Sequence, residues 1–353
     1  MPAFRTFRGT LSSSVAHHTF DIMRVPRLLL AAILFCTSVL ATASDLRQIG
    51  MVNIPGSPGF GELAFCNGML LMTHPGASAV DVFDPVKRRI VAQITGLQSP
   101  RGLAADEQGG KVYVADHGSN SIAVIATDGW KVVDSIGLPG SPDAVLLDGE
   151  GKMYWTDADA GLISLLDLRT KQDTVRTDLG GTPRELEWDG ARKMVFATLQ
   201  DLHQVVTIDP QLKVVNRFTL NASQPTGLVY DPEYHELYVA VRFAVLAISA
   251  DTGAEIDRVA APSGVDRLWL DPESHTLYAA SEGSLLTLNA KGRLSLADEI
   301  TTQVKGHAVA YDAERKMVLL PGGREGKSKL VIFRPMTLNG QAGSDEPAEA
   351  KVR

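Results

Sequence analysis

The feature that most constrains the fold is an Asp or Asn that recurs at an almost fixed interval along the chain. The seven positions are separated by steps of 39, 42, 41, 42, 40 and 41 residues: Asn67, Asp106, Asp148, Asp189, Asp231, Asp271 and Asp312. Most follow a short apolar run, and a second run comes soon after, as in Lys111–Asp116 (KVYVAD). Because Asp and Asn side chains can hydrogen-bond to their own backbone two residues on, each position marks a turn between strands. A period near 40 built of short strands predicts a radial array of small sheets.

Each full repeat contains four apolar runs at the spacing of a four-stranded antiparallel meander. In the second repeat these runs are 102–105, 112–115, 122–125 and 132–136. They are rich in β-branched residues and are joined by Asp-Gly, Gly-Gly and Asp-Pro pairs, which favour strands and turns over helices. We therefore predict an all-β fold, a seven-bladed β-propeller made of four-stranded antiparallel blades.

The last repeat offers only three apolar runs, at 308–311, 317–320 and 330–333. The segment 46–52 resembles the fourth strand of the other repeats, such as 131–138, and both segments are followed by Pro-Gly-Ser. We expect this N-terminal strand to complete the last blade and close the ring, which would leave no long exposed strand edge. Residues 44–337 then form one domain.

The N-terminus resembles a secretory signal. Arg24 and Arg27 precede an apolar run over 28–40, which is too short to span a membrane comfortably. Ala41-Thr42-Ala43 has the small-x-small pattern of a cleavage site, so we expect region 1–43 to be removed, with Met23 as the true start. The predicted location of the mature protein is periplasmic or extracellular, and an uncleaved anchor is the alternative. The polar tail 338–353 is predicted to be disordered.

The charge of the mature chain argues against nucleic acid as a partner. Region 1–43 contains four basic residues and one acidic residue, so its removal changes the net charge from −7 to −10. An acidic chain without a Lys/Arg cluster is poorly suited to bind phosphate backbones or anionic membranes. Cys66 is then the only cysteine left, and its apolar surroundings predict a buried, inert thiol.

The repeat register also predicts a site. In this fold the inner strand of each blade begins at one rim of the central channel. Counting back five residues from each turn position selects a set in which six of seven members are charged or titratable: Glu62, Arg101, Asp143, Arg184, Thr226, Asp266 and His307. Loops after the second strands should add polar groups to the same face: His74, Asp116, His117, Asp157, Asp159, Arg242, Glu282 and Arg324. We predict a charged channel rim.

Three interpretations of this rim remain open. The charges can simply pair with one another, for example as an Arg101–Asp143–Arg184 arc. The same arginines can instead bind a carboxylate or phosphate of a ligand. On the opposite arc, Glu62, Asp266 and His307 offer oxygen and imidazole groups that could hold a divalent cation or include a general base.

Motifs of the common hydrolases and cofactor proteins do not occur. The sequence contains no His-x-x-x-His zinc pair, no Gly-x-Ser-x-Gly elbow, no phosphate loop and no Cys-x-x-Cys-His haem attachment. The sequence therefore indicates no cofactor, apart from the divalent cation of the alternative interpretation.

The runs Val112–Asp116 (VYVAD) and Leu237–Ala240 (LYVA) resemble the YVTN repeat, and Gly118–Ile125 continues the match. The mature chain thus resembles the exported YVTN-repeat, YncE-like propellers. Tyr154–Asp157 matches the YWTD motif, but only one repeat carries it. The resemblance implies an exported binding or scaffold protein whose ligand is not specified by the motif.

Two functional hypotheses follow. In the first, a non-enzymatic propeller presents the charged rim to a small polar or anionic ligand or to a partner protein. In the second, a metal-dependent hydrolase or lyase of the lactonase-like propeller group acts at the channel mouth. The lactonase-type propellers usually show a Glu/Asn/Asp ligand set, and the two inner-strand asparagines of that set are not visible in this sequence.

Overall fold

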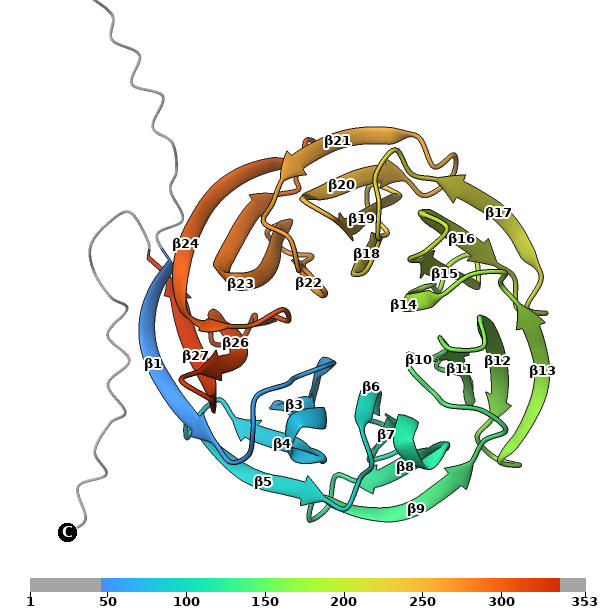
Figure 1. Cartoon of the computed structure of the whole chain (residues 1–353), viewed down its shortest axis with the longest axis horizontal. Helices are drawn as coiled ribbons and strands as arrows, with labels where there is room; N and C mark the ends of the chain where they lie inside the picture. The colour runs from blue at the N-terminus through green and yellow to red at the C-terminus, as the bar shows by residue number, and fades with distance from the viewer. Residues whose placement is uncertain (1–45, 337–353) are drawn as a thin grey trace, which may run out of the picture. The chain divides into compact units, whose positions relative to one another are not determined.

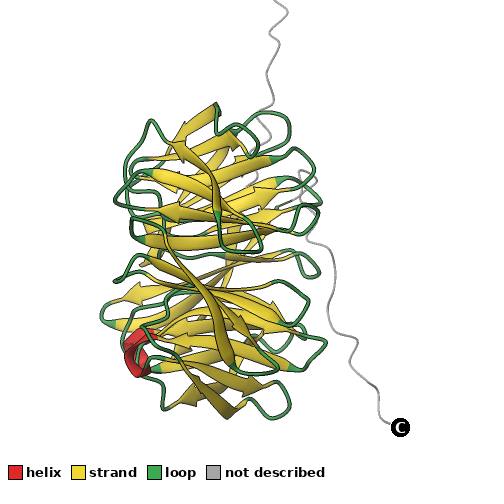
Figure 2. Ribbon diagram, turned by 90° about the vertical axis from the view of Figure 1, so that its right-hand side faces the viewer, coloured by secondary structure: helices red, strands yellow, loops and turns green. Residues whose placement is uncertain are grey.

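In a computed structural model, residues 46–336 are described and form a ring of antiparallel sheets arranged around a central axis (Figure 1). The described residues contain strands and only two short helical turns, η1 (Pro75–Ala77) and η2 (His117–Ser119), as Figure 2 shows. This is an all-β β-propeller. The predicted signal region 1–43 and the predicted tail 338–353 lie outside the described residues.

Five sheets are separate four-stranded blades, and in each of them the chain runs from the innermost strand to the outermost. The first two blades are β2 (Leu63–Cys66), β3 (Met69–His74), β4 (Ala79–Asp84) and β5 (Arg89–Thr95), then β6 (Pro100–Asp106), β7 (Lys111–Asp116), β8 (Ser121–Ala126) and β9 (Lys131–Gly137). The third and fourth blades are β10 (Val145–Leu147), β11 (Lys152–Asp157), β12 (Leu162–Asp167) and β13 (Gln172–Asp178), then β14 (Pro183–Asp189), β15 (Met194–Leu199), β16 (Gln204–Ile208) and β17 (Val214–Thr219). The fifth is β18 (Leu228–Asp231), β19 (Glu236–Val241), β20 (Ala244–Ser249) and β21 (Glu255–Ala260).

The prediction of seven separate four-stranded blades is wrong, because the rest of the chain forms one seven-stranded sheet. Its strands are β22 (Leu268–Asp271), β23 (Thr276–Asn289), β24 (Ser295–Lys305), β25 (Ala310–Asp312), β26 (Met317–Arg324), β27 (Lys327–Pro335) and β1 (Leu46–Ile54). β23 continues through a stretch where the repeat predicted a loop. β24 runs on to Lys305, which pairs with Gly323 of β26 and so joins two repeat units into one sheet.

The second and third strands of each blade are buried almost throughout. In β7 only Lys111 is exposed, and the following side chains through Asp116 are buried. These apolar residues pack against the neighbouring sheet; for example, Tyr154 and Leu165 of one blade lie in one cluster with Val195 and Val206 of the next. The core is therefore distributed around the ring between successive sheets, which leaves the inner ends of the strands free to line the axis.

The N-terminal strand closes the ring as predicted. β1 pairs antiparallel with β27, from Leu46 opposite Pro335 to Ile54 opposite Ser328, with one register shift between Gln48 and Gly50. β1 lies on the outside of the seven-stranded sheet (Figure 1). The first described strand of the chain thus pairs with backbone N–H and C=O groups that would otherwise be exposed along the edge of β27.

Candidate functional site

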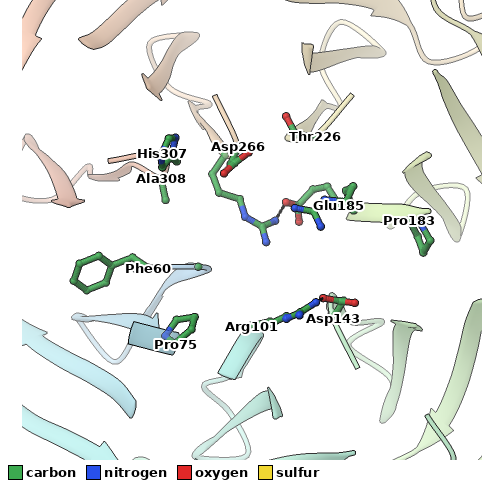
Figure 3. Close-up of a pocket in the computed structure, with 13 residues that line it drawn as sticks. Phe60, Pro75, Arg101, Asp143, Pro183, Glu185, Thr226, Asp266, His307 and Ala308 are labelled. Carbon is green, nitrogen blue, oxygen red and sulfur yellow. Dashed lines mark hydrogen bonds and ion pairs between the residues drawn. The ribbon is translucent and has the colours of Figure 1, made fainter. Parts of the chain in front are cut away.

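Six of the seven residues selected by the repeat register line one cavity of about 360 Å³. Arg101 and Arg184 stand near the starts of β6 and β14, and the other four lie in segments that lead into or between inner strands: Asp143, Thr226, Asp266 and His307. Figure 3 shows these segments converging from different sheets on the same space. The remaining lining residues are Phe60, Gly61, Pro75, Pro183, Glu185, Arg267 and Ala308.

The inner ends are held together by hydrogen bonds that pass from one blade to the next. The Gly102 N–H donates to the Asp143 carbonyl at 2.8 Å, and the Arg267 N–H donates to the His307 carbonyl at 3.0 Å. A Cβ on Gly102 would lie 2.5 Å from the Asp143 carbonyl oxygen, so only glycine permits this approach. The cavity therefore has a wall fixed by backbone contacts, with polar side chains projecting from it.

Part of the predicted Arg–Asp–Arg arc forms. Arg101 Nη1 makes an ion pair with Asp143 Oδ1 (Figure 3), while Asp143 Oδ2 accepts the Ala158 N–H at 3.1 Å. His117 approaches the same carboxylate, with Nδ1 3.8 Å from Asp143 Oδ2. Arg184 takes no part in this group, because the structure gives its side chain no ion pair or hydrogen bond within residues 46–336.

Two other lining side chains are held by the backbone of the segment before β22. The Thr226 hydroxyl donates to the Val265 carbonyl at 2.7 Å, and His307 Nδ1 lies 2.5 Å from the Gly264 carbonyl. The second ring nitrogen of His307 lies 3.9 Å from Glu282 Oε1. These contacts fix the orientation of the threonine and histidine at the cavity wall.

Glu62 lies apart from the other six register residues, in a smaller neighbouring cavity of about 170 Å³. Its carboxylate Oε2 is 2.9 Å from Arg267 Nη1, and the same nitrogen pairs with Glu185. Arg267 and Glu185 line both cavities, so their ion pair is the partition between them. Figure 3 shows an arginine that extends into the centre of the ring to meet Glu185.

A third glutamate, Glu187, also lines the smaller cavity. Burial, and to a smaller extent the negative charge of Glu62, raises the pKa of Glu187 to about 8, while hydrogen bonds from the backbone N–H groups of Trp188 and Tyr230 act in the opposite direction. Arg267 is the single basic residue that lines this cavity in the described structure. This environment favours the protonated form of Glu187 near neutral pH.

The repeat register did not select Arg267, Glu185 or Glu187. Arg267 and Glu185 each follow a selected residue by one position, and Glu187 interrupts the otherwise apolar run Leu186–Trp188. A charged residue inside an inner-strand apolar run was the visible signal. Glu185 and Glu187 are two residues apart on β14, so they share a face of the strand and both line the smaller cavity.

None of the loop residues predicted for the rim lines the cavity. His74, Asp116 and Asp157 are buried; Asp116 and Asp157 are hydrogen-bonded next to their own blades, and His74 contacts Asp81 of its own blade as well as Ser57 and Ser328 beside it. Arg242 packs over the exposed ring of Phe243, with 5.2 Å from its guanidinium carbon to the ring centre. Glu282 and Arg324 are exposed and pair with Lys305 and Gln303, and Asp159 is an exposed neighbour of His117.

The alternative metal set does not assemble. Within residues 46–336, no three His, Cys, Asp or Glu side chains come together in a group that could hold a metal ion. Glu62 lies against Arg267, whereas Asp266 and His307 face the larger cavity. In the same part of the chain, no helix has the length and apolar character needed to cross a membrane.

The fold and the repeats define the class: this chain is a repeat protein of the β-propeller type. The NHL repeat model matches residues 97–125, which include β6, β7 and most of β8. The chain is 21% identical over 201 residues to the antigen Lp49 of Leptospira interrogans serogroup Icterohaemorrhagiae serovar copenhageni, a match that covers 51% of this chain and 43% of the antigen. This chain thus matches less than half the length of that relative.

Among solved structures, the fold is similar to a chain of hydrazine synthase from Kuenenia stuttgartiensis. The TM-score is 0.68 at 15% sequence identity, and the likeness covers 78% of this chain and 95% of the other. At this identity the likeness concerns the fold alone.

Proposed function

We propose that this protein is an exported binding propeller of the YVTN-repeat, YncE-like kind that captures a small polar ligand in the larger cavity. The observation that carries the proposal is the convergence of six register residues, from separate repeats, on that one cavity. Concave sites with a few convergent polar groups are where small ligands commonly bind.

The lining chemistry favours binding over a role in packing alone. Arg101 is balanced by Asp143, and Arg267 by Glu62 and Glu185, so these pairs stiffen the wall. Arg184 is exposed and keeps its donors for a partner. Because a charge-assisted hydrogen bond contributes about 1.5–3 kcal/mol, one free arginine in a fixed cavity can orient a small anionic group.

The test is native mass spectrometry of the full chain produced in its own host. We expect a small molecule to co-purify with the wild-type chain and to be lost on denaturation. The Arg184→Ala variant should carry at most about one tenth of the amount that the wild type carries. Arg324→Ala is the matched control, because Arg324 is an exposed arginine outside the cavity. A wild-type mass equal to that of the bare chain, or a protein partner retained equally by all variants, would contradict a small-molecule role.

A further inference from the structure

The larger cavity contains two unpaired charges of opposite sign. Of its charged lining residues, Arg101 is paired with Asp143, and Arg267 with Glu185. Arg184 and Asp266 are different: the structure gives neither side chain an ion pair or a hydrogen bond within residues 46–336. Both are exposed to the space they line. They come from different sheets, with Arg184 on β14 and Asp266 just before β22.

We propose that the ligand of this cavity is a zwitterion, with its carboxylate on Arg184 and its ammonium group on Asp266. The inference rests on the proposed function and names the chemical class of the ligand. A guanidinium offers a planar, two-pronged donor for a carboxylate, and a carboxylate accepts several hydrogen bonds from an ammonium group.

The surroundings of Asp266 support a cationic partner. Although its carboxylate is open to the cavity, protein lies around it on most sides, and this desolvation raises the pKa of Asp266 above its ordinary value. Electrostatic interactions with His307 and Arg184 oppose that rise without cancelling it. An ammonium group placed beside Asp266 would supply the missing close counter-charge.

Ligands with a single kind of charge fit less well. A dianion could use Arg184 but would place negative charge near Asp266, Asp143 and Glu185. A simple amine could use Asp266 but would leave Arg184 unpaired and repelled. Thr226 and His307 are already engaged with backbone carbonyls, so they add polarity to the wall without adding a net preference for either sign.

The experiment compares three probes of equal chain length by isothermal titration calorimetry on the full chain: 5-aminopentanoate, pentanoate and pentylamine. We expect 5-aminopentanoate to bind at least about tenfold more tightly than either singly charged probe, since it alone makes both charge-assisted contacts. Equal binding of 5-aminopentanoate and pentanoate would overturn the zwitterion assignment while leaving an anion-binding function intact. Binding of none of the three would also overturn it, and ligand capture in mass spectrometry would still test the proposed function separately.

Charge-removing variants assign the two ends. Arg184→Gln should abolish the advantage of 5-aminopentanoate over pentylamine, and Asp266→Asn should abolish its advantage over pentanoate. Arg324→Gln and Asp159→Asn remove exposed charges that do not line the cavity and should leave all three affinities unchanged. If Arg184→Gln and Asp266→Asn fold, as judged by an unchanged cooperative melt, and keep the full preference, the two residues are not the anchors.

Discussion

His74 Nδ1 lies 2.7 Å from Asp81 Oδ2, and both side chains are fully buried. The second ring nitrogen, Nε2, is 2.7 Å from the Ser57 carbonyl and 3.2 Å from the Ser328 hydroxyl. Ser57 follows β1, Ser328 belongs to β27, and His74 and Asp81 belong to β3 and β4. This buried group therefore fastens the closing sheet to the first blade, which explains why His74 is not at the cavity.

Asp81→Asn should destabilise the protein by about 2–4 kcal/mol, because it removes a buried carboxylate that His74 and Gln93 contact, without changing the size of the side chain. Urea unfolding at constant pH measures the effect. Asp159→Asn, at an exposed aspartate, should change stability by less than about 0.5 kcal/mol. Equal stabilities of the two variants would show that the buried group does not fasten the ring.

Deletion of 44–54 should open the ring, because it exposes the edge of β27 along its whole length. We expect loss of the cooperative thermal transition and aggregation, measured by calorimetry and size-exclusion chromatography. A synthetic peptide of the same residues, added during refolding, should restore the transition. A truncated chain that melts like the full chain would refute closure by β1.

The free energy of unfolding should fall as the pH rises from about 5 to 9, in part because of Glu187. Its pKa is raised from the ordinary value of 4.5 to about 8 in the folded chain, so the folded state holds more protons than the unfolded state between these values. The contribution of protonated Glu187 to the free energy of unfolding is thus fully present below pH 4.5 and is lost as the pH rises through 8.

Glu187→Gln should remove this part of the pH dependence and stabilise the protein at pH 9 by on the order of 1–2 kcal/mol, allowing for water in the channel. Urea unfolding at pH 6 and pH 9 measures it. Glu299→Gln, at an exposed position of β24, is the control. Its free energy of unfolding should equal that of the wild type at both pH 6 and pH 9. If the free energy of unfolding of Glu187→Gln changes with pH as steeply as that of the wild type, the pH dependence arises from other groups.

The Cys66 thiol should be inert in the folded protein. It is fully buried, and burial, with smaller contributions from Glu107 and Asp106, raises its pKa to about 11. Thiolate is the reactive form, so a disulfide reagent at pH 8 should label the native chain at least about a hundredfold more slowly than the urea-unfolded chain. Comparable labelling rates would mean that β2 is not held in the core.

Export should leave a mature chain that begins at Ser44. N-terminal sequencing of protein from the extracytoplasmic fraction tests this, and Ala43→Arg should block cleavage because the site requires small residues. An intact Met1 or Met23 in the membrane fraction of the wild type would contradict the prediction.

The turn positions were predictable from sequence because the chemistry of each is local. Asp148 Oδ1 accepts the N–H of Glu150 at 2.7 Å, and Asp231 Oδ1 accepts the N–H of Glu233 at 2.9 Å, as the self-bonding turn requires. A period set by such turns also places one equivalent residue of each repeat at or just before its inner strand, and this is why six residues spread over the chain meet at one cavity.

The predictions from sequence fail where contacts between distant parts of the chain decide the strand pairing or the position of a side chain. The register between Lys305 and Gly323 joins two repeat units into one sheet, and no local pattern specifies that pairing. Glu62 occupies the same register position as Arg101, but it pairs with Arg267 and lines the smaller cavity. His74 and Asp157 are the last residues of β3 and β11, not members of rim loops, and their neighbours bury them. Such outcomes depend on contacts between segments that are far apart in the sequence or belong to neighbouring sheets.

The pairing of β1 with β27 also sets an order of events during biosynthesis. The first described strand has its partner in the last described strand, so nearly the whole described chain must appear before this contact can form. Blades built from consecutive strands can assemble as they emerge, whereas the final junction waits for completion. A chain released early would hold formed blades and an unsatisfied seam, and quality-control proteases could recognise that seam as the mark of an unfinished molecule.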